Sequence, residues 1–335
     1  MRALIFTGRR LSFALPQILG ITLFTFLLLR LLPNPAYQLV GPFATPGTQA
    51  ALNKRLGLDQ PVWVQYVKYL NHLVHGDLGQ SWFTAGSVSS ELIRRTPATL
   101  ELITISLFLS ILFGVGFGVL AAWKGGAIAD RLFRTYGLLA GSFPDFWLGL
   151  LAAFVFFFLL RWLPAPIGQL GQGVVPPPHV TGMYVFDSVL AGQWSTAASA
   201  VGHLILPVFT LVIVCAAPIL KMARSTMREM LASDFCTYAR ASGLSETTVL
   251  RYALRNTMPP IVTLIGISYG YLLGGAVLVE NVFSWGGLGQ WVVESVAQAD
   301  YFAVQGFILV AALFNLAVYL IVDLIHLGVD PRVEY

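Results

Sequence analysis

Residues Leu102 to Trp123 read LITISLFLSILFGVGFGVLAAW and contain no charged side chain. A helix of this length is ~33 Å long, at a rise of ~1.5 Å per residue. The hydrocarbon core of a bilayer is ~30 Å thick, so an uncharged apolar run of this length is typical of a membrane-spanning helix. The sequence therefore predicts such a helix here.

Five other stretches share this length and composition. They are Leu11–Leu29, Thr135–Leu160, Val201–Leu220, Asn256–Val279 and Tyr301–Val322. The second of these carries one charge, Asp145, directly after Pro144, and a proline at that place predicts a kink or a re-entrant start. We therefore expect an all-α fold, namely a polytopic membrane protein with six transmembrane helices.

The first span follows Arg9 and Arg10. Its apolar run is longer than the ~7–15 residues of a signal-peptide core, and no small-residue cleavage site follows it. We interpret this span as an uncleaved anchor. The two arginines are better explained as a positively charged inner flank than as a twin-arginine export signal.

The overall composition agrees with a membrane environment. Charged residues make up 11% of the chain and apolar residues 56%, whereas a soluble domain has ~25% charged residues. These values exclude an ordinary cytosolic enzyme, a disordered regulator and a nucleic-acid binder. The two cysteines, Cys215 and Cys236, give neither a disulfide framework nor a CxxC metal pair. We therefore expect most of the chain to be surrounded by membrane lipid.

The distribution of lysine and arginine predicts the orientation, because cytoplasmic loops carry an excess of both. With the N-terminus inside, the inner segments hold 3, 3, 6 and 1 basic residues and the outer segments hold 5, 0 and 0. The inner segments are 1–10, 123–134, 221–260 and 327–335, and the outer ones are 33–97, 164–200 and 280–300. Both termini are thus predicted to be cytoplasmic.

This orientation divides the chain into three parts. Residues 1–32 form an N-terminal tail and the first helix, residues 33–97 an outer segment, and residues 98–335 a core domain with the inner loop 221–260. The outer segment contains two predicted short amphipathic helices, Ala50–Leu58 and Trp63–His75.

The residues offer little for catalysis. Neither HExxH nor GxSxG is present. His72 and His75 would share one helix face but lack an obvious third metal ligand, and His203 is better explained as a hydrogen-bonded packing residue. We therefore predict no catalytic residues and no metal site.

Two classes of transport protein are compatible with this composition: an ion-coupled secondary transporter and an ATP-driven transporter. An ion-coupled secondary transporter needs acids at membrane depth. The candidates are Glu101, Asp145, Glu280 and Asp323. All but Asp145 lie at span ends, where headgroup water is expected. For an ATP-driven transporter, none of the four lysines follows a glycine, so no phosphate-binding loop exists and ATP must be bound by another chain.

The inner loop contains a polar stretch, Asp234–Asn256, which reads DFCTYARASGLSETTVLRYALRN. Gly243 can end a first helix in a left-handed conformation, and Ser245 can cap a second that runs roughly to Ala253. Pro259-Pro260 is expected to stop this second helix before the fifth span. The stretch is either a docking element for a cytoplasmic partner or a loop held inside by its positive charge.

This polar stretch resembles the "EAA" loop of binding-protein-dependent ABC importer permeases, in particular the dipeptide/oligopeptide/nickel subfamily. The resemblance covers nearly the whole chain, with the motifs in the same order. Within the family, the chain is similar to the first of two paralogous permease subunits. Its other segments are Leu28–Pro33, Leu56–Tyr66, Gly76–Ser81, Thr96–Leu102, Val279–Gly289, Asp300-Tyr301 and Asp330–Arg332. The sequence departs from the family pattern at Thr237 (where the family has Glu), at Pro33-Asn-Pro35 and at Gly168–His179.

The resemblance implies partners and a mechanism. The partners are a paralogous permease, two ATPase subunits that bind ATP and Mg, and a substrate-binding protein; this chain itself would hold no cofactor. A short helix around Gly243–Tyr252 would sit in a groove on one ATPase and couple its closure to alternating access. The implied coupling residues are Ala239, Arg240, Ala241, Gly243, Leu244, Ser245, Arg251, Arg255 and Asn256.

The translocation path is less visible. Gly266, Gly270 and Gly274 recur every four residues, which favours close helix packing over ligand contact. Asn315, Tyr319 and Asp323 share a related face of the sixth span, and either line the path or satisfy one another. The outer segment is predicted to seat the binding protein through its aromatic residues Trp63, Tyr66, Tyr69 and Trp82. The cargo stays open among dipeptides, longer peptides, glutathione, nickel chelates and sugars.

Overall fold

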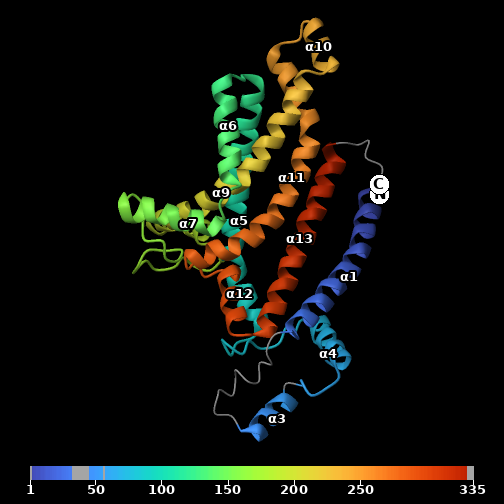
Figure 1. Cartoon of the computed structure of the whole chain (residues 1–335), viewed down its shortest axis with the longest axis vertical. Helices are drawn as coiled ribbons and strands as arrows, with labels where there is room; N and C mark the ends of the chain where they lie inside the picture. The colour runs from blue at the N-terminus through green and yellow to red at the C-terminus, as the bar shows by residue number, and fades with distance from the viewer. Residues whose placement is uncertain (1, 32–44, 56, 330–335) are drawn as a thin grey trace. The chain divides into compact units, whose positions relative to one another are not determined.

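The structure is a computed structural model, which describes residues 2–31, 45–55 and 57–329. The described residues are almost entirely helical and include no strand, and one isolated antiparallel bridge pairs Gln80 with Ser87. The helices, shown in Figure 1, are α1 (Arg2–Leu29), α3 (Pro46–Arg55), α4 (Val62–Val74), α5 (Val88–Trp123), α6 (Ala127–Ala140), α7 (Asp145–Ala152), the π-helix η1 (Ala153–Leu159), α8 (Tyr184–Leu190), α9 (Trp194–Leu231), α10 (Asp234–Ala241), α11 (Glu246–Val282), α12 (Leu288–Ala297) and α13 (Tyr301–Val329). The motif segments Pro33–Pro35 and Asp330–Arg332 lie outside the described residues.

Five helices are long and apolar enough to cross a membrane. They are Ser12–Leu29 within α1, all of α5, α9 and α11, and Tyr301–His326 within α13. A sixth candidate is the pair Arg131–Ala140 and Asp145–Leu159, which is bent by 105° at a short break and is either a broken span or a re-entrant loop. Pro144 directly precedes α7, in extended conformation, so the predicted kink at Pro144-Asp145 is confirmed. The predicted all-α membrane fold is confirmed as well, with five spans, or six when the bent pair is counted as one.

The prediction that Pro259-Pro260 ends a short helix is wrong. Residues from Glu246 onward are the first turns of α11, which passes through both prolines and continues to Val282. Prolines are tolerated in membrane helices because neighbouring side chains satisfy the freed backbone groups. The carbonyls that lose an N–H partner to these prolines are those of Arg255 and Asn256. Nearby, the Thr257 hydroxyl donates to the Leu254 carbonyl at 2.8 Å and the Thr263 hydroxyl donates to the Pro259 carbonyl at 3.2 Å.

The described chain falls into two compact units, of which unit 1 comprises residues 1–97 and 286–316. Its core cluster joins the start of α5 to α12 and the start of α13, and contains Val88, Leu92, Leu288, Trp291 and Ala303. Gly306 on α13 permits this packing, because a Cβ there would lie 2.6 Å from Val88 Cγ1. The same unit holds α1 against α4.

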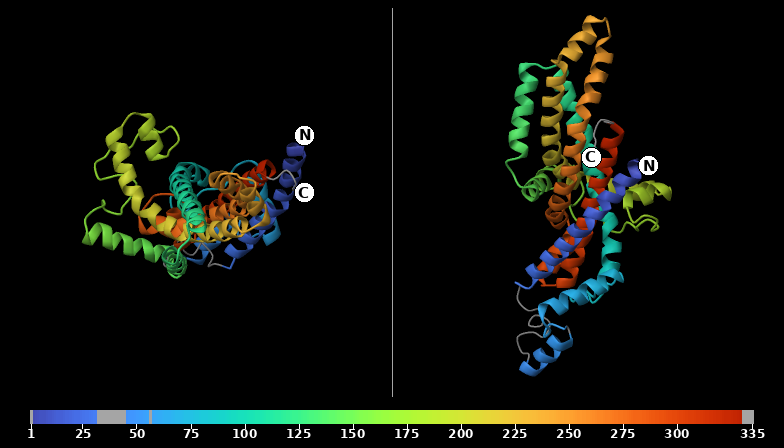
Figure 2. Two further views of the ribbon diagram at one scale, coloured as in Figure 1. Left: turned by 90° about the horizontal axis from the view of Figure 1, so that it is seen from above. Right: turned by 90° about the vertical axis from the view of Figure 1, so that its right-hand side faces the viewer.

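Unit 2 comprises residues 98–285 and 317–335. Helices α9 and α11 lie side by side in it, with α6 beside α9, as Figures 1 and 2 both show. Helix α5 packs closely on α9, because a Cβ at Gly114 would lie 2.8 Å from Ile219 Cγ2, and a Cβ at Gly118 would lie 2.8 Å from Ala223 Cβ. Glycine backbone approach of this kind is a common means of packing helices in lipid.

Two acids of unit 2 are buried in protein, so the expectation that they meet headgroup water is wrong. Glu101 is 4% exposed and Glu280 is fully buried. The backbone N–H groups of Tyr184 and Val185 donate to Glu101 at 3.0 and 2.8 Å, and the Thr99 hydroxyl donates to Glu280 at 2.6 Å. Because these partners are within the chain, each carboxyl group holds the fold together.

Candidate functional site

Helix α10 stands at the end of the α9–α11 pair in unit 2 (Figure 1). Its start is capped by Ser233, whose hydroxyl oxygen accepts from the backbone N–H of Cys236 at 3.5 Å. Its end is a Schellman turn: Leu244 N–H donates to the Ala239 carbonyl, and Gly243 N–H donates to the Arg240 carbonyl. We refer to residues 233–245 as the α10 segment.

Gly243 has a φ of +79°, so the predicted left-handed helix end at this residue is confirmed. Ser245 occupies the predicted N-cap position of the following helix, which is α11, but its side chain makes no capping hydrogen bond to the backbone. Its hydroxyl lies 2.9 Å from that of Thr248.

The α10 segment is fixed to the helices below it by a small apolar core. Cys236 and Ala239 are buried together with Met227, Val249 and Ala253. Ala239, a predicted coupling residue, thus packs inward. Because α10 is anchored through one face, its other face is free to carry exposed side chains.

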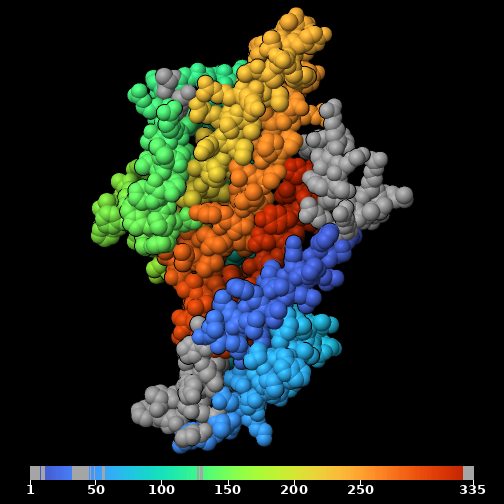
Figure 3. Space-filling model, turned by 45° about the vertical axis from the view of Figure 1, so that its right-hand side comes forward, coloured from blue at the N-terminus to red at the C-terminus, as the bar shows by residue number. Residues whose placement is uncertain are grey.

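Exposed aromatic residues mark that other face. Tyr238 is 75% exposed and Phe235 is 50% exposed, and Leu244, a predicted coupling residue, is 42% exposed. In the space-filling view α10 projects from the end of unit 2 (Figure 3). Neither Phe235 nor Tyr238 was predicted to be functional. The signal for them in the sequence is the presence of two aromatic side chains in the most polar part of the chain.

The predicted coupling arginines differ in their surroundings. The Arg240 guanidinium donates to Glu246 at 3.1 Å and to the Leu231 carbonyl at 3.2 Å, so it ties α10 to α9 and α11 within this chain. Arg251 and Arg255 are exposed on α11, as is Asn256, which donates to the Tyr252 carbonyl at 2.8 Å. Ala241 is exposed at the end of α10.

The candidate path residues Asn315, Tyr319 and Asp323 all lie on α13. Asn315 donates to the carbonyl of Ala311 on its own helix at 3.2 Å, and Tyr319 is 44% exposed. The predicted role of the fifth-span glycines in close helix packing is supported at one position and not at another. A Cβ at Gly266 would lie 2.9 Å from Val322, which supports helix packing, whereas a Cβ at Gly274 would meet nothing within 4 Å.

Asp145, the acid inside the third span, lies where α7 meets α11. It is 8% exposed, and the Tyr271 hydroxyl donates to its two carboxylate oxygens at 2.8 and 3.1 Å. The adjoining Gly275 makes room for it, because a Cβ there would lie 2.5 Å from Asp145 Oδ2. A phenol–carboxylate pair is therefore built into the bent span.

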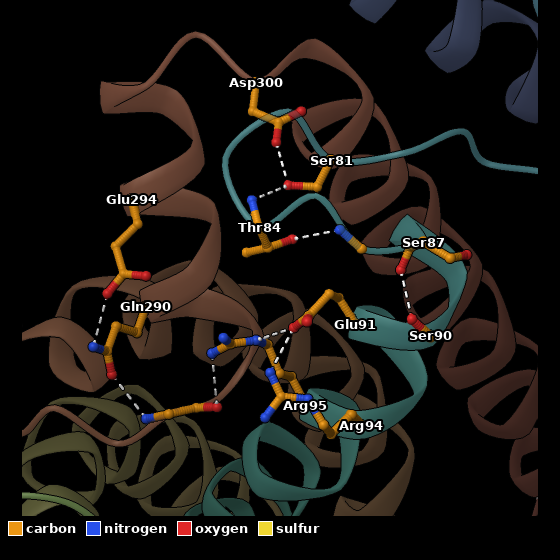
Figure 4. Close-up of polar contacts among 12 residues, drawn as sticks. Ser81, Thr84, Ser87, Ser90, Glu91, Arg94, Arg95, Gln290, Glu294 and Asp300 are labelled. Atoms are coloured by element: carbon orange, nitrogen blue, oxygen red, sulfur yellow. Dashed lines mark hydrogen bonds and ion pairs between the residues drawn. The ribbon is translucent and has the colours of Figure 1, made fainter.

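Unit 1 contains a polar network that unites distant motif segments (Figure 4). The Ser81 hydroxyl donates to Asp300 at 2.5 Å, although 219 positions separate the two residues. Arg95 donates to Glu91 at 2.9 Å and to the carbonyl of Gly286 at 3.3 Å, and Figure 4 shows these groups converging from α5 and the start of α12. The motifs thus serve to fix the unit internally.

The aromatic residues of the outer segment are not equivalent. Tyr66 and Tyr69 pack against Phe26 of α1, with ring centroids 5.3 and 6.1 Å away, and Trp82 packs against Tyr301 and Phe302. Trp63 is 71% exposed. Of the four aromatic residues predicted to seat a partner, Trp63 is the one left on the surface.

The three histidines considered for chemistry have separate protein partners. His72 Nδ1 lies 2.9 Å from Asp77, His75 Nδ1 lies 2.7 Å from the Asn71 carbonyl, and His203 Nδ1 lies 2.8 Å from the Ser199 carbonyl. The Gly79 N–H and the His72 ring lower the pKa of Asp77 below its ordinary value of 3.8. The prediction that His203 is hydrogen-bonded is confirmed.

Comparisons with known proteins agree with this architecture. Residues 114–335 match the family model of the binding-protein-dependent transport system inner membrane component, and residues 3–103 match the model for the N-terminal part of such membrane components. The chain is 38% identical to the dipeptide transport system permease protein DppB of Alkalihalophilus pseudofirmus, over 99% of this chain and 100% of that protein.

Two further relatives carry different cargo in their names. The chain is 42% identical to the probable D,D-dipeptide transport system permease protein DdpB of Escherichia coli, over 94% of this chain and 93% of that protein. It is 35% identical to the glutathione transport system permease protein GsiC of Salmonella paratyphi A, over 98% of each.

The fold and these matches define a multi-pass inner-membrane protein of the permease class. The chain belongs to the family of binding-protein-dependent transport system inner membrane components. The family predicted from the sequence motifs is therefore confirmed.

Proposed function

We propose that this chain is the permease subunit of an ATP-driven ABC importer, and that it forms a translocation path with a paralogous permease for peptides or a related small solute. A binding protein delivers the cargo, and two ATPase subunits bind ATP and Mg and supply the energy. The full-length similarity to permeases named for dipeptide transport carries this proposal.

The α10 segment supports a coupling role. It joins α9 and α11 and stands at the end of that pair. Its exposed aromatic side chains lie in the same part of the chain as the exposed arginines of α11. Aromatic and arginine side chains are enriched at protein–protein hot spots. The proposed contact surface comprises Phe235, Tyr238, Leu244, Arg251 and Arg255. It keeps three of the nine predicted coupling residues, Leu244, Arg251 and Arg255, and adds the two exposed aromatic residues. The inward-facing Ala239 and the other five predicted residues are not part of it.

The orientation follows from this assignment. The α10 segment lies in the cytoplasm with both termini, and the segment containing α3 and α4 lies outside. In that orientation Trp63 is available to the binding protein. The outer segment and the α10 segment would then meet two different partners.

A crossed pair of variants tests both contacts. Tyr238→Ala should lower copurification of the ATPase subunits at least tenfold, because a hot-spot truncation costs about 2 kcal/mol or more, and should leave binding-protein capture unchanged. Trp63→Ala should do the reverse. Tyr238→Phe keeps the ring and should restore ATPase binding. Normal assembly of Tyr238→Ala would contradict the coupling role.

The energy source separates this proposal from an ion-coupled secondary transporter. Uptake by the reconstituted system should stop when ATP is withheld and should persist when an uncoupler collapses the proton gradient. The opposite result would favour the secondary transporter. The ligand that copurifies with the binding protein identifies the cargo.

A further inference from the structure

A large groove in unit 2 lies between α6, α9 and α11, and we call it the α6–α9–α11 groove. Its volume is about 1060 Å³, which is slightly above the ~300–1,000 Å³ of small-molecule pockets. Helix α6 lies beside α9 in both views of Figure 2. All three helices belong to membrane spans.

One end of the groove is positively charged. Lys221, Arg224 and Arg228 line it from α9, and Arg134 lines it from α6. The three α9 residues are spaced by three and four positions, which places them on one helix face. Among the residues that line the groove, none is acidic, so this end is complementary to an anion.

Most of the remaining lining is apolar or aromatic, and Ser225 and Ser268 are its polar members besides the Tyr271 hydroxyl. It includes Phe133, Leu138 and Phe143 on the α6 side and Leu264 and Ile267 on α11. Leu138 is 67% exposed and Ile267 is 53% exposed. A peptide or another small polar solute would lose its hydration along such a surface, whereas hydrocarbon would not.

The length of the groove matches one leaflet of a bilayer. Val214 and Arg228 both line it, and fourteen residues of helix span ~21 Å. Half of a ~40–45 Å membrane, headgroups included, is ~20–22 Å. The apolar part of α9 ends at Leu220, so Lys221 and Arg224 lie where the hydrocarbon ends and phosphate groups begin.

We infer that the α6–α9–α11 groove is a binding site for an anionic membrane phospholipid. Its phosphate lies among Arg134, Lys221, Arg224 and Arg228, and an acyl chain lies along the apolar lining toward Phe143. Basic pockets between membrane helices are a recurrent means of holding such headgroups. The inference rests on the membrane placement and the groove, and does not depend on the proposed transport function.

The charge of the groove is tested by lipid retention. The assembled transporter, purified in mild detergent, is incubated with equimolar phosphatidylglycerol and phosphatidylcholine, and bound lipid is counted by native mass spectrometry. The wild type should retain phosphatidylglycerol preferentially. The double variant Arg134→Gln/Lys221→Gln should lose this preference, by about fivefold per charge. The double variant Lys124→Gln/Arg131→Gln removes two cations outside the lining and should match the wild type.

The apolar part is tested by filling it. A Cβ at Gly137 on α6 meets nothing within 4 Å and Gly137 lines the groove, so Gly137→Phe should occupy the space and release lipid of both headgroups. Gly116 on α5 is equally open but outside the lining, and Gly116→Phe is the matched control. Melting curves of all variants verify folding.

Two results would overturn the inference. One is equal retention of the two lipids by the wild type, or unchanged selectivity in Arg134→Gln/Lys221→Gln. The other is crosslinking to the paralogous permease, and not to lipid, from a photo-reactive residue at position 137. The groove would then be a subunit interface.

Discussion

Asp187, a single carboxylate, organises the loop that precedes α8. It is 1% exposed and accepts from the Thr181 hydroxyl at 2.7 Å and from the backbone N–H groups of Val180, Thr181 and Gly182. Burial alone would raise the pKa of Asp187, but these donors outweigh it and hold the pKa below the ordinary value of 3.8. The ionised form is therefore the one that stabilises the fold.

Asp187→Asn should destabilise the protein by about 2 kcal/mol at pH 7, because an amide NH₂ would face backbone donors in place of a charged acceptor. A lowered folded-state pKa gives stability that is present above the ordinary value and lost as the pH falls through the folded value. The difference in thermal midpoint between wild type and variant should hence shrink below a pH of about 3.8. A difference that stays constant with pH would contradict this account, and Asp59→Asn, at an exposed acid, is the control.

Among single residues, the sequence predicted those whose backbone role depends on neighbours only a few positions away. Gly243 and Ser245 could be placed because a helix end and a helix start each leave a signature within a few positions. Glu101 and Glu280 could not, because their partners are Tyr184 and Thr99, whose proximity is decided by the packing of separate helices.

Among the elements, the contact between α5 and α9 depends on glycine. A Cβ at Gly118 would lie 2.8 Å from Ala223 Cβ and 2.9 Å from the Leu220 carbonyl oxygen, whereas a Cβ at Gly116 would meet nothing within 4 Å. Both glycines lie on the same helix, two residues apart. Substituting each of them by alanine therefore separates the effect of helix packing from the effect of helix propensity.

Gly118→Ala should lower the free energy of unfolding by about 1–3 kcal/mol, since overpacking forces the two helices apart. Gly116→Ala should leave it unchanged or raise it by up to about 1 kcal/mol, because alanine favours the helix. Thermal unfolding in detergent measures both variants. Equal stability of the two would show that α5 and α9 are not in close contact.

The elements were largely predictable because each span is a continuous apolar run between charged flanks. The exception is α11, where Pro259-Pro260 suggested a break. A proline rule derived from local backbone sterics fails here, because α11 packs along α9 and stays helical through both prolines.

For the whole molecule, the orientation in the membrane is open to direct measurement. Cys215 is 1% exposed and Cys236 is fully buried, so the unmodified chain should react weakly with a thiol reagent. With a membrane-impermeant maleimide, Trp63→Cys should be labelled in intact spheroplasts, and Tyr238→Cys only after permeabilisation. The reverse pattern would place the N-terminus outside, and the unmodified chain supplies the background.

What the sequence could not predict at this scale is which distant segments share a unit. Residues 286–316 fold with residues 1–97, and Ser81 donates to Asp300. Neither pairing follows from spacing or periodicity, since contacts between segments more than two hundred positions apart are determined only by the assembled core.

The length of the α9–α11 pair has a mechanical consequence. Helix α9 has 38 residues and is therefore ~57 Å long, which exceeds the ~30 Å hydrocarbon core of a bilayer by ~27 Å. A rod of this length would act as a lever, because a swing of about 5° about the end opposite α10 would displace the α10 tip by about 5 Å. The surplus length thus trades a small angular change within the lipid for a larger linear stroke beyond it.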